Sequence, residues 1–145
     1  MTAKEYLNQV RSLEFKVSQR KKQVAELKQV AQSISSPSTG ERVQASQTGG
    51  TLEKAVEKYI GLAETAELQA ISLNELKDEI ITRIEKTDDS RLLKILTFRY
   101  LDYLTFEEIA VKMNYSFRQV LRLHDMALVD FAQNNKDVIK SHIRE

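Results

Sequence analysis

Apolar side chains recur every three or four residues along most of this chain, which is the spacing of one face of an α-helix. The first run extends from Tyr6 to Ile34 and alternates steps of four and three residues without a break. A heptad pattern sustained over about four repeats predicts a long helix in a coiled coil or a bundle. The members of this stripe are Tyr6, Val10, Leu13, Val17, Arg20, Val24, Leu27, Ala31 and Ile34.

One position of this stripe is charged. Arg20 stands where an apolar residue is expected, and Arg20-Lys21-Lys22 is the densest basic run in the sequence. Two interpretations are open. Arg20 covers apolar surface with its stem and sets the register of the helix, or the run is a basic arm that contacts phosphates.

A second run of helical spacing extends from Thr51 to Lys86, with Thr51 as the expected helix cap. Small residues along it (Gly61, Ala63, Ala66, Ala70) would allow another helix to approach closely. We expect the two long helices to form an antiparallel hairpin. Two hairpins from two chains would bury stripes that one hairpin leaves half exposed, which predicts a homo-oligomer and favours a dimer. The apolar positions are Leu52, Val56, Tyr59, Leu62, Ala66, Leu73, Leu76, Ile80 and Ile84.

Residues 35–50, SSPSTGERVQASQTGG, interrupt the helical spacing and contain the only proline and three of the four glycines. This composition predicts a mobile loop. It is either a flexible connector of the hairpin or, around Arg42-Val43-Gln44, a segment that contacts a partner or DNA. Residues 1–87 are therefore expected to form a helical hairpin that serves as an oligomerisation arm.

Residues 88–145 are expected to form a second, smaller domain. Asp88 or Asp89 is a suitable cap for a helix from Arg91 to Leu104. Acidic and basic residues are equally numerous in this domain, so phosphate neutralisation alone should give it only weak affinity for DNA. The apolar face of the expected helix comprises Leu92, Leu93, Leu96, Tyr100, Leu101 and Leu104.

The stretch from Thr105 to His124 predicts two short helices joined by a tight turn, a helix-turn-helix. Thr105 and Glu108 have the spacing of a capping box, and Ser116 is a cap for the second helix. Asn114 lies between them and tolerates the left-handed conformation that the turn requires.

The outer side of the second short helix is the candidate DNA-binding surface. Arginine is suited to guanine and glutamine to adenine, and Phe117 would contact thymine methyl groups. The alternatives are that Phe117 is a buried packing residue and that Arg118 and Arg122 form a solvated helix face. The candidate residues are Ser116, Phe117, Arg118, Gln119, Leu121 and Arg122.

Other chemistry has little support in the sequence. There is no cysteine, and His124 and His142 are too far apart to form a local metal motif. The acidic pairs Asp88-Asp89 and Glu107-Glu108 stand at expected helix starts, where they act as caps rather than as catalytic acids or metal ligands. We therefore expect no enzyme, no cofactor and no metal. Since no apolar run is long enough for a membrane span, we expect a soluble, cytoplasmic protein.

The segment from Leu92 to Leu128 resembles the fourth region of bacterial sigma factors. The resemblance is carried by Arg99-Tyr100-Leu101, by Thr105-Phe106-Glu107-Glu108-Ile109-Ala110, and by Ser116, Val120 and Ala127-Leu128. The chain departs from that pattern at Asn114, where the family usually has glycine, and at the bulky Phe117 and Leu121. With its helical arm, the whole chain is similar to phage-encoded late regulators of the ArpU and RinA type.

This resemblance implies an all-α protein in which a helical arm precedes a sigma-region-four-like helix-turn-helix domain. It implies a sequence-specific transcriptional regulator of phage or prophage genes that acts as an oligomer. Its partners would be double-stranded DNA, further copies of the chain and, as an additional candidate, RNA polymerase. The alternatives are a phage DNA-packaging recognition protein similar to a small terminase subunit, and a helical adaptor that binds protein.

Overall fold

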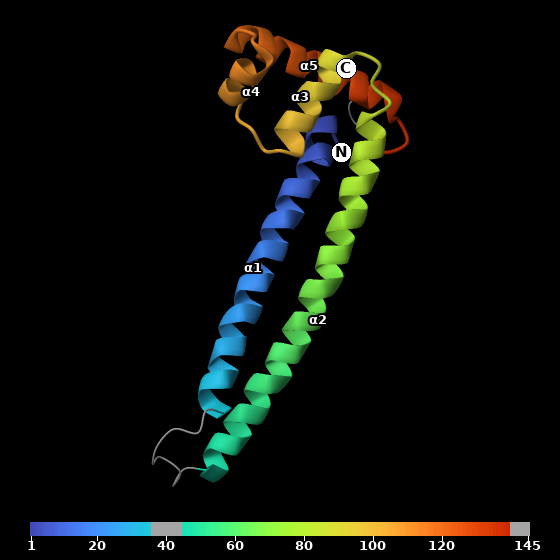
Figure 1. Ribbon diagram of the computed structural model, residues 1–145. Helices are drawn as coiled ribbons and strands as arrows, with labels where there is room; N and C mark the ends of the chain where they lie inside the picture. Colours follow the sequence, from blue (N-terminus) through green and yellow to red (C-terminus); the bar gives the residue numbers. More distant parts are fainter. Residues whose placement is uncertain (36–44, 140–145) are drawn as a thin grey trace. The chain divides into compact units, whose positions relative to one another are not determined.

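The computed structural model describes residues 1–35 and 45–139, and the side chains of these residues except those in 34–49. The described part is all-α, as the apolar spacing predicts. No strand occurs in these ranges. The helices are α1 (Ala3–Ser35), α2 (Ala45–Ile84), α3 (Ser90–Tyr100), α4 (Phe106–Met113) and α5 (Phe117–Asn134) (Figure 1).

The chain divides into two compact units. The first comprises Met1–Leu13 and Leu73–Glu145, and the second comprises Glu14–Ser72. Each long helix therefore contributes residues to both units. The first unit contains the beginning of α1, the end of α2 and the three short helices α3, α4 and α5.

The core of the first unit is formed by the apolar stripes of its helices. The Tyr6 ring lies 5.9 Å from the Phe131 ring, measured between centroids, so the start of α1 packs against α5. Burying these side chains contributes about 1.5–3 kcal/mol for each large one. The fully buried apolar side chains include Leu7, Val10, Ile80, Ile84, Ile95, Leu96, Ile109, Val120, Phe131 and Ile139.

Helix α3 begins as expected but buries a partly different face. The carboxylate of Asp89 accepts a hydrogen bond of 2.9 Å from the Arg91 amide, which confirms the predicted cap. Ile95, which the sequence pattern did not include, is fully buried, whereas Leu93 and Leu101 are only half-buried. The expected helix to Leu104 ends earlier, at Tyr100, and Leu101 is its C-cap.

Helix α5 ends at Asn134. Asn135 is its C-cap, and its buried side-chain amide donates a hydrogen bond of 2.9 Å to the Phe131 carbonyl. The amides of Val138 and Ile139 both donate to the Asn135 carbonyl, so the chain continues beyond the helix in a hydrogen-bonded turn. Residues 140–145, including His142, lie outside the described part.

The second unit contains the middle of α1 and most of α2. Val17 and Ala66 are buried, in agreement with the two stripes, but Val56 is exposed. Gly61 is also exposed, and among the described residues no other helix brings an atom within 4 Å of the position that a Cβ would occupy.

Parts of the predicted loop 35–50 are helical, because α1 extends to Ser35 and α2 begins at Ala45. Thr51 consequently lies inside α2 and is not its cap, which corrects the prediction. The backbone of this helix includes the two glycines before Thr51, although each costs about 1 kcal/mol relative to alanine within a helix. Arg42-Val43-Gln44 lies outside the described residues. None of the described helices combines the length and the apolar character that crossing a bilayer requires.

Candidate functional site

Helix α4 starts at the predicted capping box. The Thr105 hydroxyl accepts a hydrogen bond of 3.1 Å from the Glu108 amide, and the Glu108 carboxylate accepts one of 2.8 Å from the Thr105 amide. These bonds satisfy two amides at the helix start that lack an intrahelical partner. They also hold the pKa of Glu108 below its usual range, because hydrogen bonds to the Thr105 backbone and side chain favour the ionised carboxylate.

The turn after α4 has the left-handed conformation that the sequence predicts. Asn114 adopts φ 63° and ψ 39°, and its amide donates to the carbonyls of Ala110 and Val111. The Tyr115 amide donates to the same Ala110 carbonyl at 2.9 Å. These bonds end α4 and reverse the chain within three residues. The direction in which α5 leaves the turn is therefore fixed by the backbone.

Helix α5 starts at Ser116, whose hydroxyl accepts a hydrogen bond of 3.1 Å from the Gln119 amide. Val120 is fully buried and packs toward the interior of the unit, while Ala110, on α4, is also buried. Ser116 therefore has a structural role at the helix start, and the remaining candidate residues follow it on α5.

The candidate DNA-binding residues of α5 differ in exposure. Phe117 is 46% exposed and Leu121 is 36% exposed, so the interpretation of Phe117 as a buried packing residue is wrong. Arg118 and Arg122 are exposed one helical turn apart, and Gln119 is half-buried. We call Phe117, Arg118, Leu121 and Arg122 the outer face of α5. It combines two cations with two apolar side chains, and no acidic residue occurs between Ser116 and His124.

Tyr100 and His124 form a buried polar pair that connects α3 to α5. The Tyr100 hydroxyl lies 2.7 Å from Nε2 of His124, and the Phe106 ring packs edge-on against the His124 ring with centroids 4.9 Å apart. Burial lowers the pKa of His124 to about 4, so the imidazole is neutral near pH 7. The Arg99 guanidinium lies over the Phe106 ring, with its Cζ atom 4.4 Å from the ring centroid. His124 is thus a packing residue that joins α3, α4 and α5.

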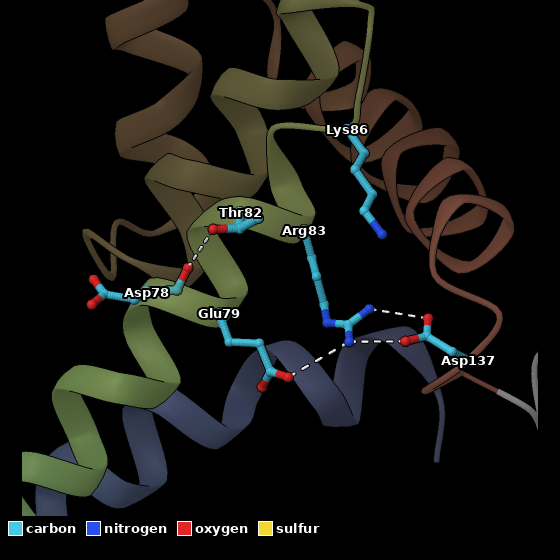
Figure 2. Close-up of a pocket in the computed structure, with 6 residues that line it drawn as sticks. All are labelled: Asp78, Glu79, Thr82, Arg83, Lys86 and Asp137. Carbon is cyan, nitrogen blue, oxygen red and sulfur yellow. Dashed lines mark hydrogen bonds and ion pairs between the residues drawn. The ribbon is translucent and has the colours of Figure 1, made fainter.

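A second polar cluster surrounds Arg83, at the end of α2 (Figure 2). Its guanidinium donates two hydrogen bonds to the Asp137 carboxylate, of 3.0 and 2.9 Å, and one of 3.1 Å to the Asn135 side chain. The carboxylate of Glu79, which is also on α2, lies 3.6 Å from the Arg83 guanidinium. The cavity here has a volume of about 340 Å³, and three of its lining charges, Glu79, Arg83 and Asp137, pair with one another. The cluster fastens the segment after α5 to α2.

Neither of these two clusters was predicted from the sequence. Each joins residues that are distant in the sequence, and no local spacing connects Arg83 with Asp137 or Tyr100 with His124. The described residues contain no group of three or more histidines or carboxylates that would hold a metal ion.

Known proteins provide no further guide to this site. No protein-family model, no curated protein and no solved structure matches the chain.

Proposed function

We propose that this protein is a sequence-specific DNA-binding transcriptional regulator of phage or prophage genes that acts as an oligomer. The observation that carries the proposal is the outer face of α5. It presents Arg118 and Arg122 next to exposed apolar side chains, on a helix whose start and direction are fixed by a capped turn.

The chemistry of this face suits the major groove of DNA. Arginine forms paired hydrogen bonds with guanine, and an aromatic or aliphatic side chain contacts the thymine methyl group. The absence of acidic residues between Ser116 and His124 keeps the start of the helix free of repulsion from phosphates. Asp125 is the first acid on the helix, one turn beyond Leu121.

The order of the short helices supports a sigma-region-four-like helix-turn-helix. In such a motif the first helix crosses the DNA backbone and the second enters the major groove. We assign these roles to α4 and α5, with α3 as the supporting helix. We assign α1 and α2 to an antiparallel hairpin arm.

The long helices favour assembly with further copies of the chain. Leu68 is 66% exposed and Ile71 is 50% exposed, one turn apart on α2, and Phe15 on α1 is also exposed. Removing such side chains from water stabilises an oligomer. A dimer would also double the number of phosphate contacts, which offsets the nearly neutral charge of residues 88–145.

Selection of bound fragments from genomic DNA tests the proposal. We expect enrichment of one sequence that contains two half-sites, with centres about 34 Å or a multiple of it apart. The bound complex should contain two copies of the chain. A ring of many copies on one packaging site would instead indicate the terminase-like function. Failure to retain any duplex at low salt would indicate a protein-binding adaptor and contradict DNA binding.

A further inference from the structure

A basic pocket lies between α3 and the end of α4. It has a volume of about 310 Å³ and is lined by Arg91, Lys94, Phe98, Lys112, Met113 and Tyr115. Three of these side chains are cationic, and no carboxylate belongs to this lining. We call these six residues the basic pocket.

Two of the three cations are available to a ligand. Arg91 is paired with Asp89, whose carboxylate accepts a hydrogen bond of 2.9 Å from the guanidinium. Within the described residues, neither Lys94 nor Lys112 is paired with an acid at salt-bridge distance. The Lys112 ammonium lies 4.9 Å from the centroid of the Phe98 ring, which holds it at the pocket wall.

The basic pocket is continuous with the turn that positions α5. Tyr115 lines the pocket and directly precedes Ser116, the residue that caps α5. Lys112 and Met113 belong to the last turn of α4, so the pocket adjoins the turn on the side of the first helix of the motif. In helix-turn-helix proteins this first helix crosses the sugar-phosphate backbone.

We infer that the basic pocket binds a backbone phosphate of the DNA strand next to the groove that α5 enters. This inference rests on the proposed function and adds a positioning contact to it. Lys94 and Lys112 contribute the charge, and Phe98 and Tyr115 form walls against which a sugar can pack. Such contacts set the register of a protein on the duplex without reading its sequence.

The test is the salt dependence of binding by the double variant Lys94→Gln/Lys112→Gln. Each lost phosphate contact should reduce the slope of log affinity against log salt by about 0.9. A bound dimer carries two basic pockets and so loses two phosphate contacts, which lowers the slope by about 1.8. Between 50 and 200 mM salt, the loss of affinity of the variant should therefore be roughly 10-fold smaller than that of the wild type. Its order of preference among DNA sequences should stay the same.

Two controls accompany this measurement. Lys94→Arg/Lys112→Arg keeps both charges and should retain the wild-type slope. Lys136→Gln removes one exposed charge outside the pocket and should also retain it. Circular dichroism melting of each variant verifies that the fold is intact.

The outcomes separate this inference from the proposed function. If the wild type binds a selected sequence but the double variant keeps its slope, the basic pocket makes no phosphate contact and only the inference is wrong. If the wild type binds no duplex at low salt, both are wrong. Titration with inorganic phosphate should give no saturable binding below millimolar concentration, and tight binding would indicate a small-anion site instead of a backbone contact.

Discussion

His124 shows how burial determines the role of a single residue. Its ring is enclosed by Tyr100 and Phe106, and burial lowers its pKa from 6.5 to about 4. Above pH 6.5 the imidazole is neutral in both the folded and the unfolded chain. Between pH 6.5 and 4 the unfolded chain binds a proton that the folded chain does not, so stability falls as the pH is lowered. Below pH 4 this loss is complete.

We therefore expect the free energy of unfolding to decrease by about 2 kcal/mol between pH 7.5 and 5.0 because of His124. Urea denaturation at the two pH values measures the decrease. The matched control is His124→Gln, which does not titrate but still offers Tyr100 a hydrogen-bond partner. An equal decrease in this variant would show that His124 is not the source.

At the scale of elements, much of the fold was predictable from local signals. The caps at Asp89, Thr105 and Ser116 and the turn at Asn114 each depend on residues within a few positions, and all were predicted. The burial of Ile95 and the start of α2 at Ala45 were not predicted. Which of several neighbouring apolar residues is buried depends on the packing of other helices, and the first residue of a helix is weakly specified where no cap marks it.

Removal of the caps should destabilise the short helices. Thr105→Ala and Ser116→Ala should each lower the free energy of unfolding by about 1 kcal/mol, because each leaves a helix-start amide without its acceptor. Thr82→Ala is the control. The Thr82 hydroxyl donates to the Asp78 carbonyl within α2, and its loss should change stability by less than about 0.5 kcal/mol. Equal effects of all three changes would contradict the assigned capping roles.

The contact between α2 and the segment after α5 depends on the shape of the Arg83 side chain. Arg83→Lys keeps the charge but cannot form the forked pair with Asp137, so the segment should open more often. Hydrogen exchange at the amides of Val138 and Ile139 should become faster. Lys86→Ala, in the same cavity but without a hydrogen bond to Asp137, should leave these rates unchanged. If the exchange rates of these amides do not change in Arg83→Lys, the contact between Arg83 and Asp137 does not hold this segment against α2.

At the scale of the whole molecule, the exposed apolar residues of the second unit predict association. Light scattering at micromolar concentration should give a mass of twice the 16.7 kDa of one chain. Leu68→Lys/Ile71→Lys should shift this mass toward that of a single chain, because the charges would be buried without partners in the oligomer. Val111 is 83% exposed in the first unit, and Val111→Lys should leave the mass unchanged. A single-chain mass for the wild type would contradict assembly through these helices.

Part of the candidate site was predictable because, like the helix caps, it depends on residues that are close in the sequence. Arg118 and Arg122 follow directly from the position of the Ser116 cap, since helical spacing then places them on one side. The basic pocket was not predictable, because Lys94 and Lys112 lie on different helices and only their packing brings them to one cavity.

The most direct test of the account is the affinity of Arg118→Ala and Arg122→Ala for a selected DNA sequence, measured by fluorescence anisotropy beside a random duplex. Each substitution should weaken binding to the selected sequence by about 1–3 kcal/mol and reduce its advantage over the random duplex. Lys136→Ala, outside the outer face of α5, should leave that advantage unchanged. Wild-type affinity and preference in both arginine variants would contradict the proposal that this face reads DNA.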